Sequence, residues 1–346
     1  MPPALPPSST MLAEARSMPG LLAAQLAADE DLYRRLAAAL RATPPLAMAT
    51  VARGSSEHAA RYLGFLVATR LGLLVPRLDP SLVTLYRAPL RSERMLALAV
   101  SQSGRSPDLV EPVRALRAGG ATAVAMVNDA ASPLAEAAEW VLPLRAGPEL
   151  AVPATKSFVA SLAAAARLVA HWCEDERLLR ALPMLPRAIE EGLRQDWSAA
   201  VAALADAERM YVVARGLGFP LAQETALKLK EACGIQAEAF SAAEIRHGPM
   251  GLVGAGYPVL VLALRGPALP GLVAFAEELR RQGAKVILAA PADVSGRAVA
   301  LAVSEAQELD PAAAVASVYP MVDALARARG RDPDRPPNLS KVMATR

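Results

Sequence analysis

Residues 43–63, TPPLAMATVARGSSEHAARYL, and residues 207–227, AERMYVVARGLGFPLAQETAL, follow one pattern. Each begins with an apolar run, continues through Ala-Arg-Gly and a turn of small residues, and ends in a stretch with helical periodicity. This order predicts a buried strand, a tight turn and a helix. Gly54 and Gly216, which occupy the same place in the two stretches, are 162 positions apart.

A second pair of similar stretches lies at nearly the same distance. Residues 113–130, VRALRAGGATAVAMVNDA, resemble residues 276–293, AEELRRQGAKVILAAPAD, and Gly120 and Gly283 are 163 positions apart. Constant spacing between separate matches indicates a tandem duplication. The length of 346 residues is sufficient for two domains of about 150 residues each.

Short apolar runs alternate with amphipathic stretches within each half of the chain. Continuous rather than alternating apolar strands are buried on both faces, so we expect an α/β fold with two doubly wound, mostly parallel sheets flanked by helices. Ligands of such sheets bind beyond the carboxyl ends of the strands. The expected division is an N-terminal tail and helix at 1–35, a first domain at 36–185, a second domain at 186–330, and a C-terminal tail at 331–346.

Composition excludes several classes of protein. Acids and bases are interspersed with a net charge of +3, and aromatic residues make up only 4%, so no nucleic-acid surface is expected. Two cysteines and three scattered histidines give neither a disulfide framework nor metal-ligand spacing, and no residue pattern requires a cofactor. The first ten residues, MPPALPPSST, are typical of a disordered tail rather than a signal peptide. The longest apolar run is broken by Arg265 and prolines, so no membrane span is expected and the protein is expected to be cytoplasmic.

The turn after the apolar run MLALAV carries an unusual density of hydroxyl groups. Ser101, Ser103 and Ser106, with the amide of Gln102, surround the expected start of a helix. Free N–H groups at a helix start attract anions, so the turn suits a phosphate monoester. An ordinary serine cap before Pro107 is the alternative.

Residues 224–249, ETALKLKEACGIQAEAFSAAEIRHGP, concentrate groups that can move protons. A helix here carries Glu224, Lys228 and Glu231, and His247 follows after a loop. A helical wheel places the three charges opposite the apolar face, so a solvated face with an i,i+4 Glu–Lys pair is the alternative.

Together these segments resemble one family: the isomerase part of glutamine–fructose-6-phosphate aminotransferase and its relatives, built from two sugar isomerase (SIS) domains. The resemblance runs from residue 11 to residue 342. The matching motifs are SQSG at 101–104, ELAVPATK at 149–156, ALKLKE at 226–231, AEAFSAAEIRHGP at 237–249 and NLSK at 338–341.

The resemblance implies a substrate-binding set. Its members are Ser101, Gln102, Ser103 and Ser106 in the phosphate-binding loop, and Ser55, Val152 and the backbone near Ser340 against sugar hydroxyls. Three positions depart from the family pattern, which places fine substrate preference in question but not the phosphosugar class: Arg105 where an acid is common, Arg53 where a cysteine is common, and Ala154 where a serine is common.

The resemblance also implies catalytic roles. Glu231 matches the base that carries a proton between C1 and C2, and Lys228 matches a lysine near the reacting oxygens. His247 matches the histidine that assists ring opening, which the neighbouring subunit of a homodimer usually supplies, so shared active sites are expected. Lys341 matches the tail lysine that forms an imine with the ketose.

The chain reaches its first repeat by about residue 40, so a preceding glutaminase domain is not expected. The resemblance therefore points to the SIS-type glucosamine-6-phosphate deaminases, which yield fructose 6-phosphate and ammonia. Related enzymes remain as alternatives: a tagatose- or galactosamine-6-phosphate ketose–aldose isomerase, or a fructosamine-6-phosphate deglycase. A non-catalytic sugar-phosphate sensor is an alternative of another class, and the retained acid, histidine and lysine argue against it.

Overall fold

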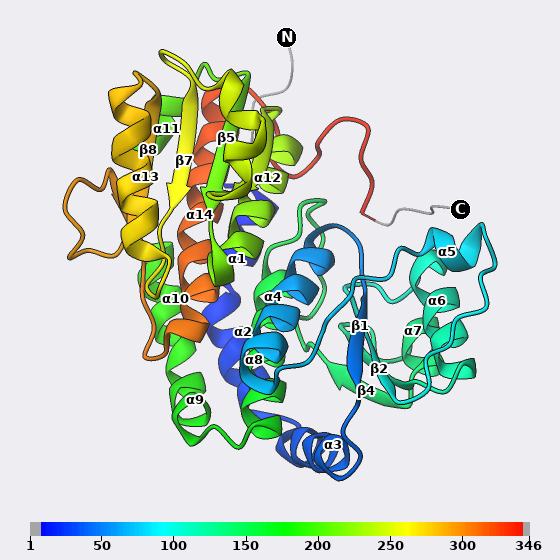
Figure 1. Ribbon diagram of the computed structural model, residues 1–346. Coiled ribbons are helices and arrows are strands. Elements are labelled where there is room, and N and C mark those ends of the chain that lie inside the picture. Colours follow the sequence, from blue (N-terminus) through cyan, green and yellow to red (C-terminus); the bar gives the residue numbers. More distant parts are fainter. Residues whose placement is uncertain (1–7, 342–346) are drawn as a thin grey trace. The chain divides into compact units, whose positions relative to one another are not determined.

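The computed structural model describes residues 8–341 (Figure 1). It comprises two compact units. Within the described residues, the β1–β4 unit comprises residues 20–149, 156–183 and 340–341, and the β5–β9 unit comprises residues 8–19, 150–155 and 184–339. The domain boundaries predicted from the sequence, 1–35, 36–185, 186–330 and 331–346, remain a proposal.

The β1–β4 unit is built on a parallel sheet in the order β1-β2-β3-β4. Its strands are β1 (Ala47–Val51), β2 (Met95–Ser101), β3 (Thr122–Val127) and β4 (Trp140–Pro143). Residues 74–78 extend the sheet beyond β1, where the Thr50 N–H donates to the Pro76 carbonyl at 3.0 Å. Strands β1, β2 and β3 are almost wholly buried, as their continuous apolar runs predict.

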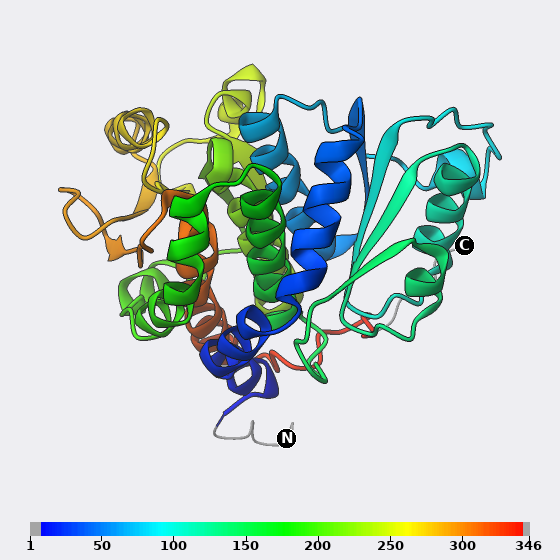
Figure 2. The same cartoon turned by 90° about the horizontal axis from the view of Figure 1, so that it is seen from below.

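Helices cover both faces of this sheet (Figure 2). On one face lie α6 (Pro107–Ala118) and α7 (Pro133–Ala137), with α5 (Ser81–Thr84) against α6. On the other lies α4 (Gly54–Leu71), which packs on α8 (Lys156–Trp172), with α3 (Glu30–Ala42) and α9 (Glu176–Ala181) against α8. Every residue of α8 is buried, which its alanine content allows because small side chains let neighbouring helices approach closely.

The β5–β9 unit is built on a five-stranded parallel sheet in the order β6-β5-β7-β8-β9. Its strands are β5 (Arg209–Ala214), β6 (Gln236–Ser241), β7 (Pro258–Leu262), β8 (Lys285–Ala290) and β9 (Val299–Ala300). The sheet packs against α13 (Leu269–Arg281) through β7 and β8, and against α12 (Phe219–Cys233) through β5 and β6.

Behind α12 lies α14 (Asp310–Ala328), the central helix of this unit, which contacts α1 (Thr10–Arg16), α10 (Leu185–Leu193) and α11 (Ser198–Leu204). Helix α2 (Met18–Ala27) follows α1. Short 3₁₀ turns complete the chain: η1 (Leu182–Met184), η2 (Gly216–Gly218), η3 (Glu244–His247), η4 (Pro249–Leu252) and η5 (Gln307–Leu309).

The two sheets confirm the duplication predicted from the sequence. Gly54 and Gly216 follow the equivalent strands β1 and β5 with φ of 55° and 59°, and Gly120 and Gly283 precede β3 and β8 with φ of 97° and 83°. Positive φ is the backbone region that glycine tolerates best, so the paired glycines are required by the same turn in each repeat.

Some of the strands and part of the N-terminal tail differ from the predictions made from the sequence. Strands β6 and β9 were not predicted. The two cysteines, Cys173 and Cys233, are free thiols. The expected disordered tail is wrong at its last residues, because Ser9 caps α1 with its hydroxyl and Thr10 begins the helix. Residues 1–7 of that tail lie outside the described residues. None of the helices within residues 8–341 is both long and apolar enough to cross a membrane.

Candidate functional site: a hydroxyl-rich turn, a buried charged triad and a paired lysine

The turn between β2 and α6 gathers hydroxyl groups at the start of a helix. Ser101 ends β2 and is buried, and its Oγ accepts the Gly104 N–H at 2.9 Å. Because that bond uses a lone pair, the Ser101 hydroxyl hydrogen remains a donor for an acceptor such as phosphate. Ser106 occupies the N-cap position of α6 without a side-chain capping bond, and Pro107 is the first residue of the helix. The simple serine-cap alternative is therefore not supported at Ser106.

Gly104 fixes the path of this loop. It adopts a φ of 64°, and a Cβ at this position would lie 2.1 Å from Ser132 Oγ and 2.9 Å from a Val127 methyl group. Glycine is therefore required here both by backbone conformation and by close packing. Arg105 is exposed and pairs with Asp129 at 2.8 Å, so its charge already has a partner beside the loop.

The neighbouring turn, between β1 and α4, carries Ser55 in the first turn of α4. Since β1 and β2 are adjacent parallel strands, this turn and the hydroxyl-rich turn lie at the same edge of the sheet. Arg53 at the N-cap of α4 reaches the first turn of α6, where its Nη2 lies 3.3 Å from Asp108 Oδ2. Arg53, which departs from the family pattern, therefore forms an ion pair between the N-termini of α4 and α6.

In the β5–β9 unit, α12 holds a triad of charges, of which Lys228 and Glu224 are buried. Lys228 Nζ lies 2.5 Å from Glu231 Oε2 and 3.5 Å from Glu224 Oε1. The side chains of Lys228 and Glu224 are 0% exposed, and that of Glu231 is 17% exposed. The solvated helix face that the wheel favoured is therefore wrong, because α12 is enclosed between the sheet and α14. Among these three side chains, only that of Glu231 is partly exposed to solvent.

His247 and Val152 belong to loops of this same unit. His247 ends η3, is exposed, and precedes Gly248 with a φ of 139°. Val152 lies in the short segment 150–155, and its N–H donates to the Asp334 carbonyl at 3.2 Å. The carboxylate of Glu14 in α1 accepts the preceding N–H groups of the segment, those of residues 150 and 151, at 2.5 and 3.3 Å. The backbone carrying Val152 is therefore held in place.

In the β1–β4 unit, the C-terminal segment brings Lys341 to a buried carboxylate. Lys341 Nζ donates to Glu149 Oε2 at 3.0 Å, and the lysine side chain is 22% exposed whereas that of Glu149 is 0% exposed. Ser340 beside it is exposed. The C-terminal segment is therefore held by this contact at Lys341. The residues after Lys341 lie outside the described part of the chain.

The predicted site residues fall into two sets, one in each unit. The β1–β4 unit contains Ser55, Ser101, Gln102, Ser103, Ser106, Ser340 and Lys341, and the β5–β9 unit contains Val152, Lys228, Glu231 and His247. The sequence interpretation gave no role to the partners Glu149 and Glu224, although both stand within motifs quoted for the family or beside them. Their burial beside a lysine is the property that identifies them.

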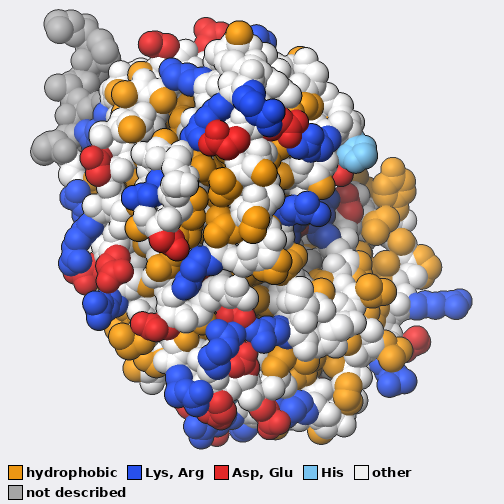
Figure 3. Space-filling model, turned by 60° about the vertical axis from the view of Figure 1, so that its left-hand side comes forward, with side chains coloured by type: hydrophobic (Ala, Val, Ile, Leu, Met, Phe, Trp, Pro, Cys, Tyr) orange, Lys and Arg blue, Asp and Glu red, His pale blue; other side chains and the backbone are white. Residues whose placement is uncertain are grey.

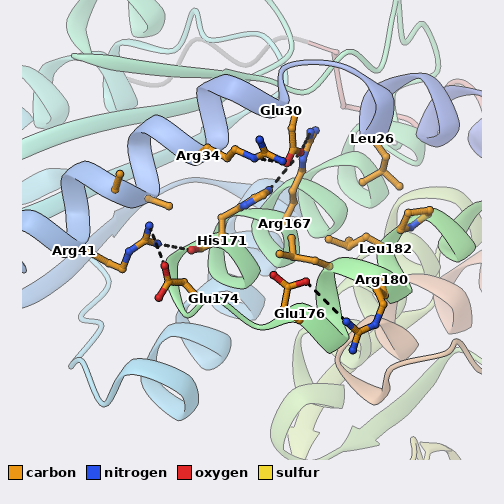
Figure 4. Close-up of a pocket in the computed structure, with 14 residues that line it drawn as sticks. Leu26, Glu30, Arg34, Arg41, Arg167, His171, Glu174, Glu176, Arg180 and Leu182 are labelled. Carbon is orange, nitrogen blue, oxygen red and sulfur yellow. Dashed lines mark hydrogen bonds and ion pairs between the residues drawn. The ribbon is translucent and has the colours of Figure 1, made fainter.

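A further cavity of about 910 Å³ lies between α3, α8 and α9 of the β1–β4 unit (Figure 4). Its carboxylates are already paired: Glu30 with Arg34 and Arg167, Glu174 with Arg41, and Glu176 with Arg180. His171 Nε2 lies 3.4 Å from Glu30 Oε2 outside hydrogen-bonding geometry, and burial lowers the pKa of this imidazole. The pairs Glu30–Arg167 and Glu174–Arg41 link α3 to α8 and to the residues that follow it, whereas the other two pairs lie within single helices.

Acidic and basic side chains are interspersed over the face drawn in Figure 3. Such mixing is unlike the one-signed surface of nucleic-acid-binding proteins.

These features define a tandem α/β protein with a hydroxyl-rich turn at a helix start in one repeat and a helix carrying a buried acid–lysine pair in the other. The SIS domain model matches residues 47–170 and 203–318, one segment in each repeat. The chain therefore belongs to the SIS domain family.

Its relatives include a glutamine–fructose-6-phosphate aminotransferase (isomerizing) of Thermus thermophilus, 36% identical over 312 residues. The alignment covers 85% of this chain and 51% of the relative, so the chain spans about half the length of the curated relatives it matches.

Among solved structures, a protein of Silicibacter pomeroyi provisionally named a phosphosugar isomerase is 40% identical, with a TM-score of 0.89 and coverage of 94% and 100% of the two chains. Glucosamine-6-phosphate deaminase of Thermotoga maritima shares the fold with a TM-score of 0.75 at 22% identity, covering 97% of this chain and 100% of the other.

Proposed function

We propose that the chain is a phosphosugar isomerase that couples isomerisation to deamination, converting glucosamine 6-phosphate and water into fructose 6-phosphate and ammonia. The observation that carries the proposal is Glu231, a partly exposed carboxylate held beside the buried Lys228 on α12. A base for carbon acids must be accessible and fixed in position, and the partial exposure of Glu231 and its contact with Lys228 support this role. The amino-sugar substrate is supported by the identity to relatives named glutamine–fructose-6-phosphate aminotransferase.

The substrate phosphate binds the turn between β2 and α6 in this proposal. Hydroxyl donors from Ser101, Ser103 and Ser106 and the N-terminus of α6 supply hydrogen bonds and a favourable dipole for a dianion. Binding energy from this remote group orients the sugar so that C1 and C2 reach the base. Ser55, Val152, Ser340 and the Gln102 amide contact the remaining polar groups of the sugar and its phosphate.

The proposed chemistry begins with His247 assisting proton transfer between O1 and the ring oxygen, which opens the pyranose. Glu231 then removes the C2 proton and returns it to C1, while the amino group loses a proton and O1 gains one. The product is a ketose with an imine at C2. Lys341 displaces ammonia from that imine, and water then hydrolyses the new imine to release fructose 6-phosphate. Lys228 stabilises negative charge on the oxygens during the proton transfer.

Purified chain incubated with glucosamine 6-phosphate tests the proposal. We expect equimolar ammonia and fructose 6-phosphate, loss of both products in Glu231→Gln, and retained binding of the substrate by that variant. Galactosamine 6-phosphate and fructosamine 6-phosphates, assayed in parallel, identify the other SIS activities. Phosphosugar binding without turnover of any of these compounds would instead identify a sensor and refute the proposal.

A homodimer with shared active sites is part of the proposal. The exposed position of His247 beside Gly248 suits a residue that acts on a site of a second subunit. Sedimentation of the purified chain tests the oligomeric state, and a monomer with full activity would refute this part.

A further inference from the structure

The carboxylate of Glu149 has partners on both oxygens. Its Oε1 accepts the Ser157 N–H at 3.0 Å, and its Oε2 accepts the Ser157 hydroxyl at 2.7 Å and Lys341 Nζ at 3.0 Å. Ser157 lies in the first turn of α8, so the carboxylate sits at a helix N-terminus. The hydrogen bonds and the helix dipole favour its ionised form.

Lys341 and Glu149 differ in their access to solvent. The lysine side chain is 22% exposed and can meet a ligand, whereas the glutamate side chain is 0% exposed. A sugar bonded to Lys341 Nζ would therefore bring its reacting atoms close to the Glu149 carboxylate. An ammonium group is not a nucleophile, so Lys341 must lose a proton before it attacks a carbonyl or imine carbon. Glu149 is a base already in hydrogen-bonding contact with the atom that carries this proton.

The hydrogen bond between Lys341 and Glu149 is a direct path for a proton. Transfer of a proton from the ammonium group to the carboxylate leaves a neutral acid beside a neutral amine. The two donors of Ser157 return the carboxyl group to its ionised form once a proton acceptor is available. A carboxyl group with these hydrogen-bond partners can donate and accept a proton several times within one reaction.

We propose that Glu149 is the catalytic proton carrier for imine formation at Lys341. This inference rests on the proposed function, since it concerns the lysine that reacts with the phosphosugar. Neither the family resemblance nor the comparison with relatives gave Glu149 a role.

The proton balance is as follows for a ketose 6-phosphate. Glu149 takes a proton from the Lys341 ammonium, and the amine nitrogen bonds to C2 while the carbonyl π electrons move to O2. Glu149 gives its proton to O2 and takes one from the nitrogen, which leaves a neutral carbinolamine. Glu149 then protonates the O2 hydroxyl, the C2–O2 bond breaks to release water, and the nitrogen lone pair forms the C=N bond. The result is a protonated imine beside an ionised Glu149.

The test measures imine formation separately from turnover. Wild-type protein, Glu149→Gln, Glu149→Asp and the control Glu136→Gln, an exposed carboxylate of α7, are incubated with fructose 6-phosphate and cyanoborohydride. Mass spectrometry then follows the rate of the reduced adduct and maps it to a lysine. Calorimetry with glucitol 6-phosphate, which has no carbonyl group, measures whether each variant still binds the phosphosugar.

We expect the adduct on Lys341 in the wild type and an adduct rate lower by about 100-fold or more in Glu149→Gln, as for loss of a general acid–base group. Glu149→Asp should recover part of this rate, and Glu136→Gln should match the wild type. Glucitol 6-phosphate should bind every variant within about threefold of the wild type, since no proton is transferred.

Three results would overturn the inference: an adduct rate in Glu149→Gln within about threefold of the wild type, parallel losses of adduct rate and binding, or an adduct on another lysine. Failure of the proposed function is a different result, namely a wild-type protein that neither turns over nor forms an adduct with any of the phosphosugars. If the wild type releases ammonia but forms the adduct at the same rate as Glu149→Gln, this inference is rejected and the proposed function stands.

Discussion

Replacing Lys228 by methionine should show how much the charged triad of α12 contributes to the free energy of unfolding. The side chains of Lys228 and Glu224 are 0% exposed, and the lysine nitrogen lies within 3.5 Å of Glu224 Oε1 and 2.5 Å of Glu231 Oε2. Methionine fills a similar volume but leaves Glu224 as a buried charge without this partner. Breaking a buried pair in this way costs about 3–5 kcal/mol, so we expect the free energy of unfolding to fall by that amount.

The matched control is Lys230→Met on the same helix, where the side chain is exposed and the expected change is within about 0.5 kcal/mol. With Trp140 and Trp172 replaced by phenylalanine, the fluorescence of Trp197 reports the β5–β9 unit during heating. At about 2–4 °C per kcal/mol for a unit of this size, Lys228→Met should lower the transition midpoint by about 6–20 °C.

A double variant completes the argument. Glu224→Gln combined with Lys228→Met removes the stranded charge, so it should recover most of the stability lost in Lys228→Met alone. A midpoint for Lys228→Met that matches Lys230→Met would refute the view that the triad is buried and coupled. Equal midpoints for the single and double variants would refute the assignment of the loss to Glu224.

Three further outcomes are expected. Ser103→Ala should weaken glucitol 6-phosphate binding by about tenfold or more, because a hydrogen bond to a charged group contributes about 1.5–3 kcal/mol, and unchanged affinity in calorimetry would contradict the loop assignment. Mixing inactive His247→Ala and Glu231→Gln subunits should restore about a quarter of wild-type ammonia release, since half of the dimers regain one intact site, and no recovery would contradict shared sites. Burial raises the pKa of Cys233 from 9.0 to about 12, so the folded thiol keeps its proton while the unfolded thiol ionises, and stability should fall as pH rises from about 9 towards 12. Cys233→Ala should flatten that decline in urea unfolding, and an identical slope would count against the buried thiol as its cause.

The fold was predictable because the duplication repeats the features that a strand and turn require. Continuous apolar runs predicted most strands, and paired glycines predicted the turns after β1 and β5. Strand β6 was missed because QAEAFS lacks the β-branched residues and continuous apolar character of a buried strand. It lies at the edge of its sheet, where pairing with β5 rather than intrinsic preference determines its conformation.

The burial of the α12 charges could not be read from a helical wheel. A wheel assigns one face to the core and the opposite face to solvent, whereas α12 packs on β5 and β6 and also on α14. Lys228 and Glu224 are therefore enclosed together, and their mutual charge makes the burial possible.

The pairing of Lys341 with Glu149 depends on contacts that no local pattern reports. The two residues are 192 positions apart, and their contact follows from the path of the C-terminal segment to the start of α8. The family resemblance predicted a reactive lysine at position 341, and the side chain that receives its proton became apparent only from the folded chain.

Deuterium exchange at C1 of fructose 6-phosphate is the most direct test of Glu231 as the base of a phosphosugar isomerase. In D₂O containing ammonia, the wild type should replace one C1 hydrogen by deuterium, observed by NMR. Glu231→Gln should show no exchange while still binding glucitol 6-phosphate. Exchange by Glu231→Gln at the wild-type rate, or none by the wild type, would contradict the account.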